Sequence, residues 1–371
     1  MGKKILILGN GFDLAHGLKT KYSNFLDLCN NTLGHNESEI PGIIMTMYSD
    51  RSPIFSDLVN KFMEKLPVFK ECICNNIWYI YLKSLYEAAN MRGENWIDFE
   101  SEIRYIIETI DIYTEDMKNA YRTISSTIHR SNILNSNKFR IFNNCHIIVE
   151  NWSIRKVRER LYHDLEDLIK AMEIYFLFIE SIPIKLKSPD IANNYDYILN
   201  FNYTHTYKRV YDKNAISFHI HGELDKNPNN MVLGIDEYWS EEKRDMHTNF
   251  TIFKKFAQRI QKRTGIESYK WFKEINDEYR NYGTLSEIFI FGHSLDITDK
   301  DILYDFLESE STSVTIFCKD KETEGEYIAK VIRIISEKRL LEKVNQYPSK
   351  FQFVIQNKME SIEEKLSGAA T

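Results

Sequence analysis

Short, mostly continuous apolar segments constrain the fold of this 371-residue chain more than any other feature of its sequence. They are rich in Ile, Val, Phe and Tyr, as strands buried on both faces of a parallel sheet tend to be. Several lead into a stretch with helical periodicity, and this alternation predicts an α/β protein with a Rossmann-like parallel sheet. The segments are KKILIL, YDYILNFN, ISFHIHG, NMVLGI, SEIFIFG, SVTIFC and FQFVI.

Two helical blocks interrupt the predicted sheet. In the longer block, large apolar residues recur on one helical face until Pro183 ends the pattern. These residues are Leu161, Leu165, Leu168, Met172, Phe176 and Ile179. The sequence therefore predicts a core with two insertions and a loosely ordered tail. The predicted core comprises residues 1–50, 186–240 and 282–358, the large helical insertion 51–185, the smaller helical insertion 241–281, and the tail 359–371.

The overall charge disfavours two classes of partner. With a formal net charge of -6, the chain has no general electrostatic attraction to nucleic acid or to an anionic membrane, although a local basic patch is compatible with this value. The first apolar run, residues 5–8, is too short for a signal peptide or a membrane span. The five cysteines are scattered and odd in number, which disfavours a disulfide framework. We expect a cytoplasmic protein with no membrane partner and no nucleic acid indicated.

A polar loop with two glycines follows the first apolar segment. Gly9 and Gly11 would let the backbone turn sharply and approach a ligand, and exposed N–H groups there could hold a pyrophosphate. The pattern is not GxGxxG, because Leu14 occupies the third glycine position. A tight turn between a strand and a helix explains the loop equally well.

Polar residues also follow the segment YDYILNFN. Asn202 would lie at the carboxyl end of a buried strand, where open α/β sheets bind ligands, and could orient a water or a ribose hydroxyl. The alternative is that Asn202 caps the following helix through Thr204 and Tyr207.

The segment ISFHIHG contains two alternating histidines. On a strand, His219 and His221 would face the same side. They could bind a metal, but no carboxylate and third ligand are spaced to complete such a site, so the sequence predicts no metal. Gly222 would let a substrate approach His221, which suits a general base, whereas His219 is interpreted as a buried core histidine.

The segment SEIFIFG ends in a fourth polar loop. Gly292 and Ser294 fit the close approach of a phosphate or a ribose, and a helix carrying Asp299 near its start follows. The alternative is that Ser294 or Thr298 caps that helix.

Five stretches, taken in order along the chain, are more specific together than any one of them alone. They are LILGNGFDLAHGLKTKYSNF, NWIDFE at 95–100, FNYTHTY, HIHG and FGHSLD. Together they strongly resemble the AbiH family of bacterial abortive-infection proteins, and the resemblance spans the chain from end to end. It implies that phage infection triggers the protein, and that the host is then shut down or killed.

The same stretches are similar, more distantly, to the sirtuin-like NAD-binding fold. Gly9, Gly11 and Gly17 have the offsets of the glycines in the sirtuin pattern GAGxSxxxG. The other similar stretches are Phe201–Thr204 for QNxD, His221–Gly222 for the catalytic HG, and Gly292–Leu295 for the GTSL that contacts the cofactor.

The resemblance implies two catalytic residues and a set of NAD contacts. Asn202 would position water or the nicotinamide ribose, and His221 would take a proton from that water or from a ribose hydroxyl. The implied NAD-binding residues are Gly9, Asn10, Gly11, Phe12, Asp13, Gly17, Thr204, Gly222, Gly292, His293, Ser294 and Leu295. Glu100, in NWIDFE, and Asp236 are further candidates.

Three departures from the sirtuin pattern restrict the implied activity. The paired CxxC motifs of the zinc module are absent, Lys19–Tyr22 replaces PDFR, and Thr204 replaces the Asp of QNxD. Without the zinc module and its acyl-lysine channel, we do not expect protein deacylation. We expect an NAD glycohydrolase in antiphage defence, which takes NAD as its substrate, uses no metal, and releases nicotinamide and ADP-ribose.

Two alternatives stay open at this point. The Thr204 departure keeps open a non-catalytic module that binds NAD or ADP-ribose and regulates a partner or an oligomer. Alternatively, the helical insertion carries the activity, since Glu100, Arg104 and Glu108 fall on one helical face. That spacing is more typical of a solvated, salt-bridged face than of a nuclease site. The sequence leaves open a homo-oligomer and the identity of the phage-derived trigger.

Overall fold

In the computed structural model the chain forms two compact units, and neither unit is continuous in sequence. Unit 1 contains Met1–Thr20, Ile179–Met231 and Lys262–Thr371, and unit 2 contains Lys21–Phe178 and Val232–Gln261. The residues that the structure describes are 2–91, 97–115, 138, 141–142, 153–192, 194–238, 240 and 248–362.

Unit 1 is built on a six-stranded sheet in which every neighbouring pair of strands is parallel. The strand order is β4-β3-β1-β5-β6-β7. Leu8, at the end of β1, pairs with Asn200 on one side and with Phe291 on the other, so the carboxyl ends of three strands lie at one edge. The predicted α/β class and parallel sheet are confirmed. The strands are β1 (Lys4–Leu8), β3 (Tyr197–Asn200), β4 (Ser217–His219), β5 (Ser286–Phe291), β6 (Thr312–Cys318) and β7 (Phe351–Ile355).

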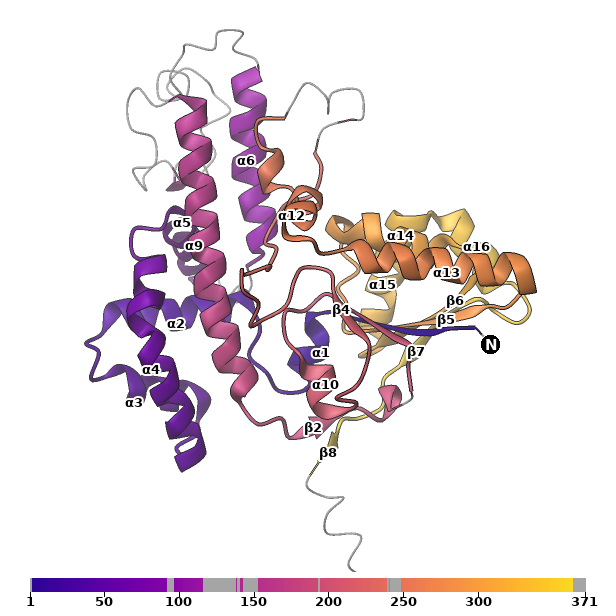
Figure 1. Ribbon diagram of the computed structural model, residues 1–371, viewed down its shortest axis with the longest axis horizontal. Helices are drawn as coiled ribbons and strands as arrows, with labels where there is room; N and C mark the ends of the chain where they lie inside the picture. Colours follow the sequence, from indigo (N-terminus) through magenta and orange to yellow (C-terminus); the bar gives the residue numbers. More distant parts are fainter. Residues whose placement is uncertain are drawn as a thin grey trace, which may run out of the picture. The chain divides into compact units, whose positions relative to one another are not determined.

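The central strands of this sheet are buried on both faces, which explains why they read as continuous apolar runs, whereas the edge strand β7 is partly exposed. In β1, Ile5 and Ile7 belong to one hydrophobic cluster, and Leu6 and Leu8 belong to another. Figure 1 shows the helices α13 to α16 gathered beside β5, β6 and β7. The helices of unit 1 are α1 (Asn10–Ala15), α10 (Thr206–Val210), α13 (Ile266–Tyr282), α14 (Lys300–Glu308), α15 (Lys321–Ile335) and α16 (Glu337–Val344).

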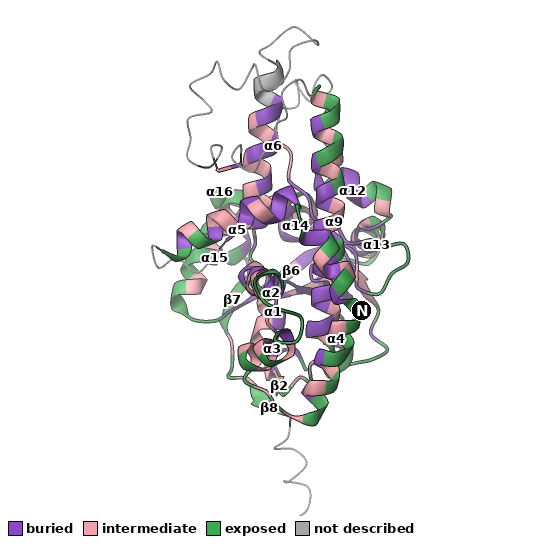
Figure 2. Cartoon of the chain, turned by 90° about the vertical axis from the view of Figure 1, so that its left-hand side faces the viewer, coloured by how far each residue is buried: buried purple, intermediate pink, exposed green. Residues whose placement is uncertain are grey.

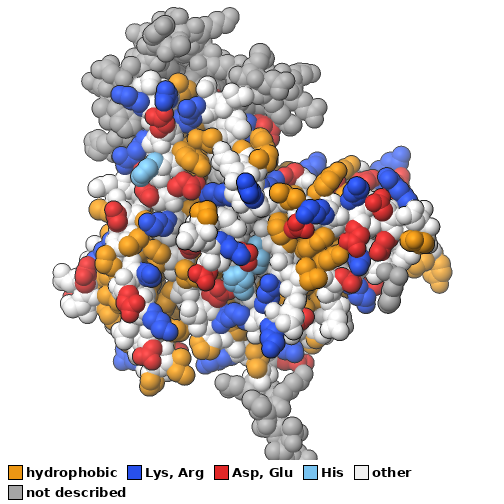
Figure 3. Space-filling model, viewed as in Figure 1, with side chains coloured by type: hydrophobic (Ala, Val, Ile, Leu, Met, Phe, Trp, Pro, Cys, Tyr) orange, Lys and Arg blue, Asp and Glu red, His pale blue; other side chains and the backbone are white. Residues whose placement is uncertain are grey.

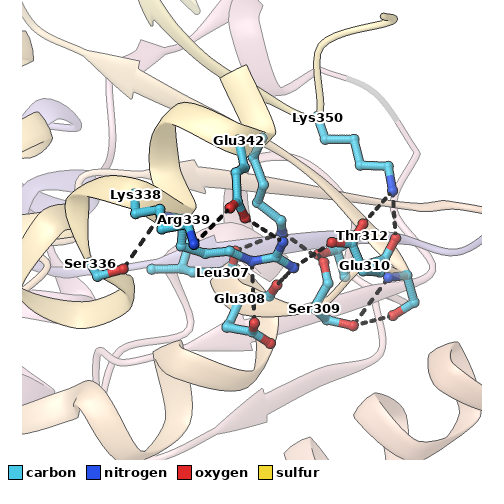
Figure 4. Close-up of polar contacts among 12 residues, drawn as sticks. Leu307, Glu308, Ser309, Glu310, Thr312, Ser336, Lys338, Arg339, Glu342 and Lys350 are labelled. Carbon is cyan, nitrogen blue, oxygen red and sulfur yellow. Dashed lines mark hydrogen bonds and ion pairs between the residues drawn. The ribbon is translucent and has the colours of Figure 1, made fainter. Parts of the chain in front are cut away.

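At the amino ends of the strands, Arg339 on α16 fastens that helix to the turn between α14 and β6 (Figure 4). Its guanidinium contacts the carboxylates of Glu308 at 3.2 Å and Glu310 at 2.6 Å, and donates to the Glu308 carbonyl at 2.7 Å. Lys350, which directly precedes β7, pairs with Glu310 at 2.8 Å. These ion pairs are structural and lie at the edge of the sheet opposite to the carboxyl ends.

A two-stranded antiparallel pair joins distant parts of unit 1. β2 (Leu186–Lys187) pairs with β8 (Glu360–Ser361), which falls in the predicted tail. Two of the tail residues are therefore in regular structure, and residues from 363 onward lie outside the described part of the chain.

The regular elements described in unit 2 are helices. The apolar stripe predicted from Leu161 to Ile179 is confirmed, because all six of its residues are buried along α9. Figure 2 shows α9 buried along one side and exposed along the other. Ser52 and Asn76 cap α4 and α5 by accepting backbone N–H groups. The helices are α2 (Tyr22–Gly34), α3 (Ile40–Tyr48), α4 (Pro53–Ile73), α5 (Ile77–Asn90), α6 (Phe99–Glu115), α9 (Ile154–Ser181, whose last turn enters unit 1) and α12 (Lys255–Lys262).

The prediction of a strand at NMVLGI is wrong. The segment forms only a single bridge, between Ile235 and Lys254. Its apolar side chains are nevertheless buried, with Val232 and Leu233 fully inaccessible. A short apolar run indicates only that its side chains are buried. It is as compatible with an irregular segment packed against helices as with a strand in a sheet.

The division into units also places some segments differently from the predicted bounds. Residues 21–50 of the predicted core fall in unit 2, and residues 262–281 of the predicted smaller insertion fall in unit 1. None of the described helices is long and apolar enough to cross a membrane. Among the described cysteines, Cys29, Cys72, Cys74 and Cys318 are free thiols.

Candidate functional site

The loops that follow β1 and β5 touch through their backbones. The Gly11 N–H donates to the Gly292 carbonyl at 2.7 Å, and the Gly9 N–H donates to the Phe291 carbonyl at 3.3 Å. A Cβ on Gly11 would lie 2.8 Å from the Gly292 oxygen, so the glycines permit this contact between loops. The expectation that these two N–H groups are exposed for a pyrophosphate is wrong, because both already donate to carbonyls.

The backbone N–H of Asn10, between these two glycines, remains available to a ligand. No described residue accepts a hydrogen bond from its backbone N–H, and its side chain is exposed and bonded to Thr20. Phe12 is buried and packs edge-on against Phe291, so its side chain belongs to the core. Gly17 is exposed with a φ of 84°.

The loop after β5 holds a strained turn. Leu295 has a φ of 53°, which is uncommon for a residue with a side chain, and it is buried. Its N–H donates to His293 Nδ1 at 2.9 Å, and this bond holds the turn. Ser294 between them is exposed. Ser294 and Thr298 do not act as caps, because Asp296 accepts the N–H of Thr298 at the start of the short 3-10 helix Ile297–Asp299.

Asn202 connects the β3 loop to the β1 loop. Its Nδ2 donates to the Gly9 carbonyl at 3.0 Å, and its own N–H donates to Asn200 Oδ1 at 2.9 Å. It is 7% exposed. The capping alternative is wrong, because α10 begins at Thr206 with His205 as its cap residue and no side-chain capping bond.

His221, Asp299 and His293 form a buried cluster at the carboxyl edge of the sheet. His221 Nε2 lies 3.1 Å from Asp299 Oδ1, and His293 Nε2 lies 3.7 Å from Asp299 Oδ2. Both imidazoles pack against the ring of Phe201. Since His293 Nδ1 accepts the Leu295 N–H, its ring proton is on Nε2, which faces Asp299. The arrangement orients His221 through a carboxylate, as a general base requires.

Only the first histidine of HIHG lies on a strand. β4 ends at His219, and the chain turns so that the Gly222 N–H donates to the His219 carbonyl, with Gly222 at a φ of 82°. Alternation along a strand therefore stops before His221. His219 Nδ1 donates to the Asn202 carbonyl and His221 Nε2 contacts Asp299, so the two imidazoles have different partners.

Asp13 is buried on the β1 side of the site. Its Oδ2 accepts a hydrogen bond of 2.6 Å from the Thr204 hydroxyl. Burial raises the pKa of the Asp13 carboxyl from 3.8 to about 6, against the opposing effect of the Thr204 and Thr206 hydroxyls. Thr204, at the place of the acidic residue in QNxD, thus has a carboxylate partner from another loop.

A second polar group, formed by His205, His219 and Glu223, lies beside the first. His205 Nε2 is 3.0 Å from Glu223 Oε2, and its Nδ1 is 3.2 Å from a carboxylate oxygen of Glu180. Hydrogen bonds to these two carboxylates raise the pKa of His205 to about 9, whereas burial lowers the pKa of His219 to about 4. The bond from His205 lowers the pKa of Glu223 to about 2.

Glu100 and Asp236 both lie in unit 2, whereas the loops described above lie in unit 1. Glu100 pairs with Lys255 at 2.8 Å, and Asp236 pairs with Arg104 at 2.8 Å. Arg104 also contacts Glu108 at 3.3 Å, as the spacing on one helical face predicts. Asn95, within NWIDFE, lies outside the described residues.

Sequence reasoning missed two parts of the site. Asp299 was noticed only as an acid near a helix start, and its pairing with His221 spans 78 positions. His205, Glu180 and Glu223 were not singled out. His205 and Glu223 follow shortly after β3 and β4. Since the carboxyl ends of neighbouring parallel strands lie at the same edge of a sheet, this position could have indicated that the two residues lie close together.

A protein-family model described as bacteriophage abortive infection AbiH matches residues 5–320. This range contains the loops after β1, β3, β4 and β5. No curated protein and no solved structure shows a significant match to the chain.

Proposed function

Since the chain belongs to the bacteriophage abortive infection family AbiH, its role lies in abortive infection, and we propose that it fulfils this role as an NAD glycohydrolase. In the proposed reaction, NAD and water give nicotinamide, ADP-ribose and a proton. A Rossmann-like, NAD-binding identity of the sheet is part of this proposal.

The strand order supports a dinucleotide site. Counted along the chain, the six parallel strands lie in the order 3-2-1-4-5-6, as in doubly wound dinucleotide-binding sheets. The order reverses between β1 and β5, and ligands of such sheets bind outside the carboxyl ends of the strands at this point. Gly9 and the start of α1 (Asn10–Asp13) follow β1, and the loop Gly292–Leu295 follows β5. The Asn10 N–H and the exposed Ser294 are the proposed phosphate contacts.

The observation that carries the proposal is the buried pair of His221 and Asp299 at the same edge. A carboxylate beside an imidazole fixes its orientation and stabilises the cation that forms when the ring takes a proton. In the proposed step, the bond between nicotinamide and ribose C1′ breaks and its electrons leave with nicotinamide, which gives an oxocarbenium-like ribose. The oxygen of water then bonds to C1′, and His221 accepts the released proton. Asn202 orients that water through its Oδ1, because its Nδ2 is occupied by the Gly9 carbonyl.

Burial of these side chains suits a defence enzyme that is silent before infection. His221 is 6% exposed and Asn202 is 7% exposed. NAD can reach them only when the surrounding loops open, and we propose that the phage-derived trigger favours the open form.

The decisive experiment measures nicotinamide release from NAD by the purified full-length chain, with and without an extract of phage-infected cells. The His221→Ala variant should lose about 100-fold or more of the rate, the usual contribution of a general base. His35→Ala is the matched control, because His35 is exposed in α2's carboxyl-terminal cap position. Equal rates for the His221→Ala variant and the wild type would refute the catalytic assignment.

A second candidate function, NAD or ADP-ribose sensing without catalysis, rests on Thr204, which replaces the Asp of QNxD. The Gly9 and Gly11 amides donate to backbone carbonyls, and Thr204 is bonded to Asp13. Calorimetric titration with NAD distinguishes the two functions. Saturable binding without nicotinamide release in the presence of the infected-cell extract would identify a sensor.

A further inference from the structure

His205, His219 and Glu223 bring three potential metal ligands together from two loops. His205 follows β3, and His219 and Glu223 flank the turn that ends β4. One ring nitrogen of His205, one of His219 and a Glu223 carboxylate oxygen all lie within 4.8 Å of one another. The Glu223 Oε2 distances are 3.0 Å to His205 and 3.9 Å to His219. These values bracket the ~3.3 Å between ligand atoms of a tetrahedral site with metal bonds of ~2.0–2.1 Å.

The outer nitrogen of each histidine already has the kind of partner that metal-binding histidines use. His219 Nδ1 donates to the Asn202 carbonyl at 2.7 Å. His205 Nδ1 lies 3.2 Å from Glu180 Oε1, and the His205 backbone N–H donates to the same carboxylate. An acceptor at Nδ1 fixes the proton there and leaves Nε2 to coordinate a metal. Both Nε2 atoms face Glu223, as a ligand set requires.

His219 Nε2 supplies a separate observation. His219 is 5% exposed, and this atom is buried with no hydrogen-bond partner among the described residues. A buried polar nitrogen without a partner is unfavourable, and a bound cation would satisfy it. An interpretation of the group as a plain histidine–carboxylate pair explains His205 but leaves this atom unexplained.

The group is accessible to an ion on one side. The side chains of His205 and Glu223 are 25% and 24% exposed. A space-filling view shows histidine atoms reaching the surface next to acidic side chains (Figure 3). Lys226 pairs with the other oxygen of Glu223 at 2.9 Å, so the Oε2 atom remains directed at the histidines.

We propose that His205, His219 and Glu223 bind one divalent transition metal ion of the Zn²⁺ class, with Glu180 and the Asn202 carbonyl orienting the two histidines. Two imidazoles and one carboxylate leave the fourth position of a tetrahedral ion to water, as in sites where zinc acts on a ligand. Nitrogen ligands favour zinc over Mg²⁺, which prefers oxygen ligands. The site does not depend on the proposed cleavage of NAD, and its test measures metal rather than turnover.

The test starts from the full-length chain treated with a chelator and then titrated with ZnCl₂ against a chromophoric zinc chelator. We expect one zinc per chain, retained through desalting and counted by mass spectrometry, and no competition from millimolar MgCl₂. A retained stoichiometry below a tenth of an equivalent would overturn the proposal.

Three variants test the ligands and one tests their support. His219→Asn keeps a donor for the Asn202 carbonyl but removes Nε2. This variant, Glu223→Gln and His205→Gln should each weaken zinc binding by about 100-fold or more. Glu180→Gln should weaken it about 10- to 100-fold, the usual effect of losing a partner of a ligating histidine. Lys226→Met should leave binding intact or strengthen it, because it removes a competitor for Glu223.

His163→Asn is the matched control, since His163 is exposed and belongs to another group of potential ligands on α9, with the buried Asp164 and the partly buried Asp167. If this variant loses the zinc and His219→Asn retains it, the assignment is wrong. If a variant does not fold, X-ray absorption spectroscopy of the zinc-loaded wild type identifies the ligands of the metal directly. Scattering from two imidazoles supports the site, and a spectrum without imidazole ligands refutes it.

Discussion

Asp13 is an acid in a position that disfavours its charge. It is 1% exposed, and its neighbours include the negative charge of Glu180 as well as the Thr204 hydroxyl. Burial raises its pKa in the folded state to about 6, compared with 3.8 in the unfolded chain. Between these two values the folded state binds more protons than the unfolded state. The free energy of unfolding therefore falls as the pH rises from about 4 to about 6, and this contribution is lost above pH 6.

Replacing Asp13 with Asn should remove this pH dependence. The shift of about 2 pH units corresponds to ~3 kcal/mol of unfolding free energy, and Asn can still accept the Thr204 hydrogen bond. Relative to the wild type, Asp13→Asn should be more stable at pH 8 than at pH 4. Urea denaturation at pH 4, 6 and 8 measures the difference, with the exposed Asp277→Asn as a control for the loss of one negative charge. A stability difference that is the same at all three pH values would contradict the assignment.

Gly11 illustrates a residue that is required by packing against backbone. In a Gly11→Ala variant, the Cβ would lie 2.8 Å from the Gly292 oxygen and 2.9 Å from the Gly292 Cα, and neither atom can rotate away. We expect a loss of ~1–3 kcal/mol in the free energy of unfolding, measured by urea denaturation. Gly34→Ala is the control, because nothing lies within 4 Å of a Cβ there and α2 ends at this residue. Equal stability of the two variants would show that the loops after β1 and β5 separate easily.

At the scale of elements, α16 is held by ion pairs in addition to the apolar contact of Leu340 with the core. Arg339 is the central cation, with a side chain 18% exposed, and it contacts carboxylates on both sides of the turn that ends α14. Removing it would leave Glu308 and Glu310 next to each other without their shared partner.

Arg339→Met should therefore lower the free energy of unfolding by ~1–2 kcal/mol, a typical loss when a partly buried, hydrogen-bonded charge loses its partner. Lys338→Met, on the same helix, is the matched control, because Lys338 is 89% exposed and 4.0 Å from Glu342. Its effect should stay within ~0.5 kcal/mol. Thermal and urea denaturation of both variants provide the comparison, and indistinguishable midpoints would show that Arg339 contributes no more than a surface charge.

At the scale of the whole molecule, each unit is assembled from separate parts of the chain. Unit 1 takes three segments and unit 2 takes two, with α9 continuing across the division at residues 178 and 179. The parallel sheet of unit 1 requires such connections, since neighbouring parallel strands are never joined by a hairpin. Residues 21–178, which include the longest helices, therefore stand between β1 and β3 along the chain.

Much of this architecture was predictable from local sequence. Six of the seven apolar runs are strands of one parallel sheet, and the α9 stripe is buried as its spacing predicts. NMVLGI was mistaken for a strand because a short apolar run shows only that it is buried. The bounds of the two units could not be predicted from local sequence either. Helical periodicity shows which face of a helix is buried, but not which core that face packs against.

The sequence by itself determined the sheet, the positions of its glycine turns and the family, because these depend on residue type and spacing within short stretches. Only the tertiary structure decided which side chains meet. His221 pairs with Asp299, Asp13 with Thr204, and His205 with Glu180 and Glu223. Parallel strands bring residues that are far apart in sequence to one edge of the sheet. Which of them then come within bonding distance depends on where each strand ends and how its loop turns.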